Sequence, residues 1–423
     1  MTAVLPAADL DLRTILRPGD RIVAGQACGE PTTLIEALIA QGAEIEGLSL
    51  FIATSFSGLF TPSAAAAFAP MSMGAIGSLR TLTREHRLRV IPCHVSRVGP
   101  MIEAGVLGCD VAFVQVAPAD ADGTHSLGLI SDHVRAAVDT ARVVVAEVND
   151  QVPRTFGERI HSSDIDVAVA VSRAPVQVQP APIGPLDEAI ARHVAGYIDD
   201  GAVLQTGVGA VPDAVLRLLH DRTDLGIHSG MIGDGLVDLV EAGVITNARK
   251  PIDPGVSVTG ALIGTERLYR FADRNPRISM RTSAYTHDPA VLARLDRLVT
   301  INSAMEVDLT GQVNAEQSGS SYVGGTGGQV DFVRAGARSR GGHAVIALPA
   351  TAKGGTISRI TTTLSGPVTT ARSDVDVIVT EYGAAELAGR TLAERARRLV
   401  AIAHPDFRAE LERTAHAIEQ RGF

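Results

Sequence analysis

The sequence predicts an α/β protein built from two related open domains with mostly parallel sheets. Three observations carry this prediction: short apolar runs recur without polar alternation, amphipathic stretches lie between them, and one strand–loop–helix pattern occurs twice. Apolar runs without alternation are typical of strands covered on both faces, and strand–helix alternation is typical of parallel sheets. A chain of 423 residues is long enough for two such domains.

The predicted strands are apolar runs of four or five residues: Arg21–Ala24, Val111–Val114, Arg142–Ala146 and Ala344–Leu348. The clearest predicted helix spans residues 32–41, where Leu34 and Leu38 lie on one apolar stripe. Gly42 follows this stripe, and glycine is common where a helix ends.

A weak internal repeat supports the two related halves. Residues 20–31 and 201–212 each read as a strand, a loop of small residues and a proline, followed by an amphipathic helix. A chance match within any α/β protein is the alternative explanation. A proline-rich segment at 176–185 is typical of a linker. We therefore expect an N-terminal domain at 1–180 and a C-terminal domain at 186–423.

Composition and charge exclude several classes of protein. A net charge of −9 argues against a general nucleic-acid binder but permits a local site for an anionic ligand. No apolar run is long enough to span a membrane, and the first residues lack the basic start of a signal peptide. Three cysteines are too few for a disulfide framework or a zinc site, so a reducing cytoplasm is the simplest setting.

The stretch 322–332 holds four glycines at positions 324–328, with Thr326 between them. Without Cβ atoms, such a loop can turn backbone N–H groups toward a ligand, including an oxyanion that develops on a carbonyl group. Glycine clusters also form plain loops, so the pattern alone leaves both readings open. The sequence shows no metal-ligand spacing, and Gly207-Val208-Gly209 lacks the third glycine of a nicotinamide-binding fingerprint.

Longer motifs link the chain to a known family. They are Glu30-Pro31, Val145–Pro153, Leu204–Pro212, Leu225–Asp238, Ile301–Asn314, the glycine loop with Asp331 and Phe332, Ile346–Ala350, Ser358–Ile360, Val368–Arg372, Val379–Gly383 and Ile402–Arg408. Together they resemble the acetyl-CoA hydrolase/transferase family, which includes the 4-hydroxybutyrate CoA-transferases. The resemblance implies a CoA-transferase-like fold of two α/β domains with the active site in the cleft between them, and a homodimer or larger homo-oligomer.

The resemblance also assigns roles to short stretches. It implies that Gly207, Val208 and Gly209 line the acyl-CoA site and that Asn314 faces the acyl group. It further implies that the loop Gly325, Thr326, Gly327 and Gly328 supplies the oxyanion and coenzyme A contacts. Tight turns and capping residues would look the same in the sequence, so structural roles stay open for each.

Two nearby positions depart from the family pattern. The family carries a glutamate after His-Ser, whose carboxylate attacks the acyl-CoA thioester and carries CoA as a glutamyl thioester. Here His228 and Ser229 are followed by Gly230, which has no side chain. Gly233 replaces a serine that is common in the family. The resemblance therefore implies an acyl-CoA site whose nucleophile position is vacant.

Three explanations follow. In the first, Glu30, Glu306 or His228 serves as a base, and the acyl group passes from CoA to water, a carboxylate or another nucleophile. In the second, the chain is a CoA-transferase that uses another carboxylate. In the third, it binds acyl-CoA without catalysis. A sugar-phosphate isomerase is a further alternative, which the motifs at 379–383 and 402–408 argue against. We rank the first explanation highest because the glycine loop is retained.

Overall fold

The computed structural model describes residues 4–422, whose contacts form two compact units. The first unit contains the chain up to Gln179 together with 230–234 and 257–288, and the second contains 180–229, 235–256 and the chain from Pro289 onward. The predicted mixed α/β architecture with mostly parallel sheets is confirmed. The predicted domain limits, 1–180 and 186–423, stay a prediction. Among residues 4–422, no helix combines the length and apolarity needed to cross a bilayer.

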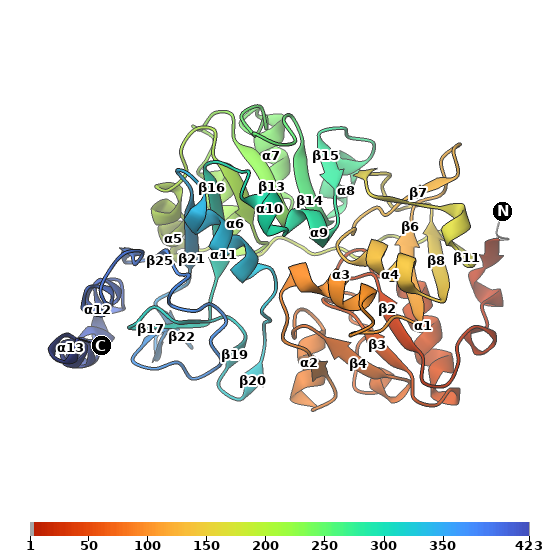
Figure 1. Ribbon diagram of the computed structural model, residues 1–423, viewed down its shortest axis with the longest axis horizontal. Coiled ribbons are helices and arrows are strands. Elements are labelled where there is room, and N and C mark those ends of the chain that lie inside the picture. The colour runs from red at the N-terminus through yellow and green to blue at the C-terminus, as the bar shows by residue number, and fades with distance from the viewer. Residues whose placement is uncertain (1–3, 423) are drawn as a thin grey trace. The chain divides into compact units, whose positions relative to one another are not determined.

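The first unit is built on an eight-stranded sheet in the order β1-β11-β8-β6-β2-β3-β4-β5, and every pairing in it is parallel. Figure 1 shows β2, β3 and β4 as neighbours in the red and orange part of the ribbon. The strands are β1 (Val4–Pro6), β2 (Arg21–Ala24), β3 (Ser49–Phe51), β4 (Ala69–Ser72), β5 (Arg89–Val90), β6 (Val111–Val116), β8 (Val143–Asn149) and β11 (Val167–Val171).

The buried strands and α1 form the core of this unit. Every residue of β6 is buried, as predicted for a strand covered on both faces. Helix α1 (Thr32–Gln41) has the predicted bounds and ends at Gly42. Its Leu34, Ile35 and Leu38 are fully buried against the sheet. Each such side chain contributes about 1.5–3 kcal/mol of hydrophobic stabilisation relative to an exposed one.

Further elements complete the first unit. Strands β14 (Ser257–Leu262), β15 (Ile278–Met280) and β9 (Phe156–Gly157) pair in parallel, and β7 (Thr124–Ser126) pairs antiparallel with β10 (Arg159–His161). The helices are α2 (Leu79–Arg84), α3 (Val95–Glu103), α4 (Val134–Thr140), α8 (Glu266–Ala272) and α9 (Ser283–Thr286).

Within the second unit, six strands pair in the order β26-β25-β21-β16-β12-β13. All of its pairings are parallel except that of β25 with β26. The strands are β12 (Val203–Thr206), β13 (Gly226–Ile232), β16 (Leu298–Ser303), β21 (His343–Ala347), β25 (Val377–Thr380) and β26 (Gly383–Glu386). The first four residues of β13 belong to this unit, and its last three belong to the first unit.

The remaining elements of the second unit surround this sheet. Its helices are α5 (Pro185–Ala195), α6 (Ala210–Arg217), α7 (Gly235–Glu241), α10 (Pro289–Leu292), α11 (Gln329–Arg338), α12 (Leu392–Ala401) and α13 (Pro405–Arg421). Its short strands are β17 (Glu306–Asp308), β18 (Val313–Asn314), β19 (Gln317–Ser318), β20 (Ser321–Tyr322), β22 (Thr351–Ala352), β23 (Ile357–Ser358) and β24 (Ile360–Thr361). Buried residues from β17, β21, β25 and β26 and from helices α12 and α13 form one apolar cluster.

The two sheets share a strand order, which supports the weak repeat seen in the sequence. The order β11-β8-β6-β2-β3 in the first unit corresponds to β25-β21-β16-β12-β13 in the second. In the first unit, β2 leads through α1 to its neighbour β3, and the later strand β6 lies on the other side of β2. In the second unit, β12 leads through α6 to β13, and the later strand β16 lies on the other side of β12. Each sheet thus has a topological switch point, and ligands of open α/β sheets bind beyond the carboxyl ends of strands at such a point.

Candidate active site

The switch point of the second unit lies between β12 and β16. The loop after β12 is Gly207-Val208-Gly209, and Glu306 lies just beyond the end of β16. Gly209 has a φ of 134°, a conformation that favours glycine, and it is the residue before α6. A Cβ on Gly207 or Gly209 would meet no heavy atom of the described chain within 4 Å, apart from its sequence neighbours. The loop is therefore open on its outer side.

Glu306 holds a neighbouring loop in place. Its Oε1 accepts hydrogen bonds from the Ser365 N–H at 2.6 Å, the Ser365 hydroxyl at 2.9 Å and the Gly366 N–H at 3.2 Å. The Asn314 amide donates to the same oxygen at 2.9 Å. A carboxylate oxygen that already accepts four hydrogen bonds is poorly placed to take a proton from a substrate. This geometry favours a structural role for Glu306.

Asn314 is fully buried and fully hydrogen-bonded. Its NH₂ group donates to Glu306 and to the Gln317 carbonyl, and its side-chain oxygen accepts from the N–H groups of Glu316 and Gln317. These four contacts use both donors and both acceptor positions of the amide. Asn314 therefore orders the chain around it, and its amide has no remaining group with which to contact an acyl chain.

The glycine loop follows directly from this ordered segment. The N–H of Gly324 donates to the Glu316 carbonyl, and a Cβ on Gly324 would lie 2.2 Å from the Ala315 carbonyl oxygen, so the close approach requires glycine. Gly327 has a φ of 56°. Gly328 precedes the ten-residue helix α11, and no side chain caps that helix terminus. The uncapped first turn offers backbone N–H donors for an anion or a carbonyl oxygen.

Glu30 is buried among hydrogen-bond donors in the first unit. It follows β2 and is 1% exposed. Its carboxylate accepts hydrogen bonds from the Phe56 N–H at 2.5 Å, the Ser57 N–H at 3.2 Å and the Ser55 hydroxyl at 3.0 Å. Burial raises the pKa of Glu30 to about 7, although these hydrogen bonds oppose the shift. A carboxyl group that titrates near neutral pH is suited to proton transfer.

Gly230 and His228 lie on β13. The two residues are two apart, so their side-chain positions share one face of the strand. His228 is fully buried, which favours packing over proton exchange with a bound substrate. The Gly230 carbonyl oxygen lies against Gly260 of β14, because a Cβ on Gly260 would be 3.0 Å from it. The chain thus brings Glu30 and Gly230 into the first unit, and His228, Asn314, Glu306 and both glycine loops into the second.

Comparison with known proteins identifies the family. Residues 10–180 match the acetyl-CoA hydrolase/transferase N-terminal domain, and residues 264–415 match the C-terminal domain of the same family. The chain is 42% identical to the 4-hydroxybutyrate coenzyme A transferase of Clostridium kluyveri over 396 residues, covering 92% of each chain. The chain belongs to the acetyl-CoA hydrolase/transferase family. Its curated relatives are named CoA-transferases and, at lower identity, acetyl-CoA hydrolases, so it is an enzyme of that type.

Solved structures agree with this assignment. The crystal structure of a 4-hydroxybutyrate CoA-transferase from Porphyromonas gingivalis is similar, with a TM-score of 0.83, 36% identity and coverage of 99% of this chain and 97% of that one. RipA from Yersinia pestis is similar with a TM-score of 0.89, 34% identity and 95% coverage of each chain. The CoA-transferase-like fold inferred from the sequence motifs is therefore confirmed.

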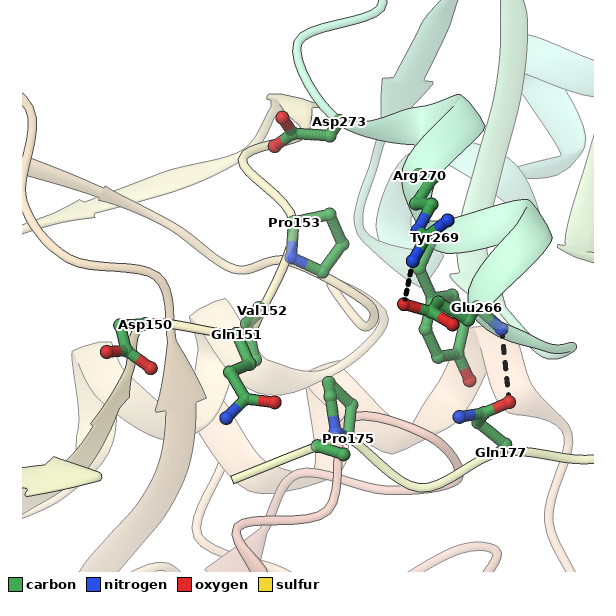
Figure 2. Close-up of a pocket in the computed structure, with 11 residues that line it drawn as sticks. Asp150, Gln151, Val152, Pro153, Pro175, Gln177, Glu266, Tyr269, Arg270 and Asp273 are labelled. Carbon is green, nitrogen blue, oxygen red and sulfur yellow. Dashed lines mark hydrogen bonds and ion pairs between the residues drawn. The ribbon is translucent and has the colours of Figure 1, made fainter. Parts of the chain in front are cut away.

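The first unit contains a hollow that none of the candidate residues lines. It has a volume of about 520 Å³ and is lined by segments 150–153, 174–177 and 266–273. Figure 2 shows Glu266 between Arg270, its ion-pair partner, and Gln177, which accepts a hydrogen bond from its N–H. The 11 lining residues include none of the candidates named above. Within residues 4–422, no three His, Cys, Asp or Glu side chains are grouped so as to hold a metal ion.

The structure also contains a buried carboxyl group that the sequence patterns did not single out. Asp132 contacts Gln26, which lies in the loop after β2. The sequence held one signal for it, since Ser131-Asp132-His133 interrupts an otherwise apolar stretch directly before α4. Single polar residues before a helix are most often caps, so that signal had no specificity.

Proposed function

We propose that this enzyme binds an acyl-CoA and passes the acyl group to water or a small nucleophile without forming a glutamyl-CoA intermediate. The observation that carries the proposal is Gly230. Membership of the family points to a thioester substrate, and a glycine offers no atom that could form a covalent bond to CoA. Coenzyme A then acts only as the leaving group of the substrate.

Two features of the second unit support thioester binding. The N-terminus of α11 is uncapped, and Gly327 ahead of it has space around its Cα, since the nearest atom to a Cβ there would be the Gly325 carbonyl oxygen at 3.9 Å. Backbone N–H groups in such a loop can stabilise the negative charge that forms on the thioester oxygen during attack. Retention of this loop favours catalysis over binding alone.

The test measures release of free CoA thiol from acetyl-CoA, butyryl-CoA and 4-hydroxybutyryl-CoA, together with the intact mass of the protein during turnover. We expect thiol release with no added CoA mass on the protein. A CoA thioester on any carboxylate of the chain would overturn the proposal. Absence of both thiol release and exchange with every substrate would support an acyl-CoA-binding protein without catalysis.

A CoA-transferase that uses a different carboxylate is the second candidate, because relatives 42% and 36% identical to this chain are named CoA-transferases. Exchange between an acyl-CoA and isotope-labelled acetate or succinate distinguishes the two. A CoA-transferase moves CoA to the labelled carboxylate and conserves the thioester, whereas the proposed reaction loses thioester as CoA thiol appears.

A further inference from the structure

A cluster of buried polar side chains lies at the carboxyl edge of the sheet in the first unit. Gln26 follows β2, and its neighbour in space is Asp132, 106 residues later in the chain. The next residue is His133, whose Nε2 lies 3.2 Å from the carbonyl oxygen of Ala24 at the end of β2. The cluster is therefore located beyond the carboxyl end of the strand that forms the switch point of this sheet.

The cluster holds polar atoms without partners. The Gln26 amide donates a short hydrogen bond to Oδ2 of Asp132, and His133 Nδ1 lies 3.9 Å from the same oxygen. Among the described residues, Gln26 Oε1, Ser131 Oγ and His133 Nδ1 are buried and have no hydrogen-bond partner, whereas the Asp132 carboxylate is also hydrogen-bonded to the side chain of Ser283. Gln26, Ser131 and His133 are at most 6% exposed, and the Asp132 side chain is 13% exposed. Buried polar atoms of a native protein are normally paired, so this set points to a missing polar ligand such as water.

The cluster is connected to the vacant nucleophile position. The Ser131 N–H donates to the Gly260 carbonyl at 2.9 Å. Gly260 in turn approaches Gly230, whose carbonyl oxygen would lie 3.0 Å from a Cβ on Gly260. All of these residues belong to the first unit. Asp132 thus follows Ser131, which donates a hydrogen bond to Gly260, and Gly260 lies against Gly230.

We propose that Asp132 is the general base for hydrolysis in place of the missing glutamate, with Gln26 holding its carboxylate in position. Asp132 takes a proton from water while the water oxygen bonds to the thioester carbon and the C=O electron pair moves to oxygen. The tetrahedral intermediate then re-forms C=O and breaks the C–S bond. The CoA thiolate receives the proton from Asp132, so one acyl-CoA and one water give one carboxylic acid and one CoA thiol. Burial raises the pKa of Asp132, which makes its carboxylate a stronger base.

This inference rests on the proposed hydrolytic function, and the experiment distinguishes a failure of the Asp132 base role from a failure of hydrolysis itself. The variant is Asp132→Asn, assayed for thiol release with water alone and with hydroxylamine as acceptor. Hydroxylamine attacks as a neutral amine and needs no base to generate it. We expect hydrolysis to fall by about 10²–10⁴-fold, while formation of the acyl hydroxamate stays close to the wild-type rate. The matched control is Asp20→Asn. Asp20 is a buried carboxylate directly before β2, at the amino-terminal end of the strand, and its replacement should leave hydrolysis unchanged.

Each other outcome has a defined meaning. Unchanged hydrolysis in Asp132→Asn, or loss of hydroxamate formation in a folded variant, would overturn the base role. A CoA or acyl adduct on Asp132 would also overturn it. If Asp132→Asn fails to fold, Asp132→Ala with added formate replaces it, and we expect formate to restore hydrolysis. Wild-type protein without any thiol release would instead reject the hydrolytic function itself.

Discussion

Gly260 approaches Gly230 so closely that a Cβ on Gly260 would lie 3.0 Å from the Gly230 carbonyl oxygen and 3.4 Å from that of Arg281. Both neighbours are backbone atoms, which cannot rotate away as a side chain can. The close approach therefore fixes the position of β13 at the residue where the family pattern expects a nucleophile. This contact can be tested directly.

We expect Gly260→Ala to lower the stability of the protein by about 1–3 kcal/mol and to reduce thiol release, because the added methyl group displaces the Gly230 backbone. The control is Gly99→Ala in α3, where the new Cβ would meet only Ala136 Cβ at an ordinary 3.6 Å. Alanine favours a helix over glycine, so this variant should be as stable as wild type or more so. Thermal unfolding measures the stability of the two variants, and the thiol assay measures their release of CoA thiol. Equal behaviour of the two variants would contradict the argument.

Gly230→Glu should introduce exchange of CoA between acyl-CoA and a carboxylate, because the family frame around the position is retained. The new carboxylate would form a glutamyl-CoA thioester, seen as an added mass on the intact protein. Isotope exchange with labelled acetate is the activity measurement. A folded variant that neither exchanges nor carries the added mass would show that the frame around the strand has also changed.

The buried Glu30 predicts a pH dependence of stability. Burial raises its pKa from 4.5 to about 7, so the folded protein retains this proton to a higher pH than the unfolded chain does. Unfolding then releases a proton between these pH values, and stability falls as pH rises from 4.5 to about 7, by about 3 kcal/mol from this group. Glu30→Gln should show a smaller fall. Denaturant unfolding from pH 5 to 7.5 measures both slopes, and parallel slopes would reject the prediction.

Gly327→Ala should reduce turnover by placing a methyl group in the open space before α11, where we propose that the thioester oxygen binds. Its backbone has a φ of 56°, so alanine there also carries a conformational cost of about 1–2 kcal/mol. Gly319→Ala is the matched control, since Gly319 has a φ of 58° and lies between β19 and β20 with space around it. Similar losses of stability with a lower kcat only in Gly327→Ala would support an oxyanion role. The same kcat in both variants would reject it.

Asn314→Ala should destabilise the second unit more than it affects catalysis. The change leaves Glu306 without one donor and the N–H groups of Glu316 and Gln317 without an acceptor, at a cost of about 1–3 kcal/mol for each buried group left unpaired. Thermal unfolding and the KM for acyl-CoA measured well below the unfolding temperature separate the effects. A raised KM at unchanged stability would return Asn314 to the acyl site.

The sequence predicted the fold well because local patterns specify it. The apolar run at Arg21–Ala24 and the stripe of 32–41 became β2 and α1 with the same bounds, since burial on both faces decides the strand and burial of one face decides the helix. The predicted strand at 142–146 was too short. Strand β8 continues to Asn149 because it stays paired with β11 as far as Val171. Glu147 in this extension is buried and accepts the Thr33 N–H, a contact between residues 114 apart. Sequence periodicity carries no information about such a partner.

The candidate site was predicted less completely, for the same reason. The glycines at 209 and 327 could be singled out because their positive φ angles favour that residue type. The hydrogen bonds that occupy Glu306 and Asn314 come from residues up to 60 positions away, so the sequence could not show that these side chains are in use. Gln26 and Asp132 were missed because only the folded sheet edge brings them together.

The division of the chain into units has a consequence for dissecting it. A fragment that ends at residue 180 loses β14 and β15, although β15 pairs with Phe156–Gly157 and Gly260 accepts a hydrogen bond from Ser131. Cutting the gene at the proline-rich linker would therefore yield an N-terminal half with an unpaired strand edge and a disrupted cluster around Asp132. The two halves are better studied by expressing both fragments in one cell, where each can supply the segments that the other lacks.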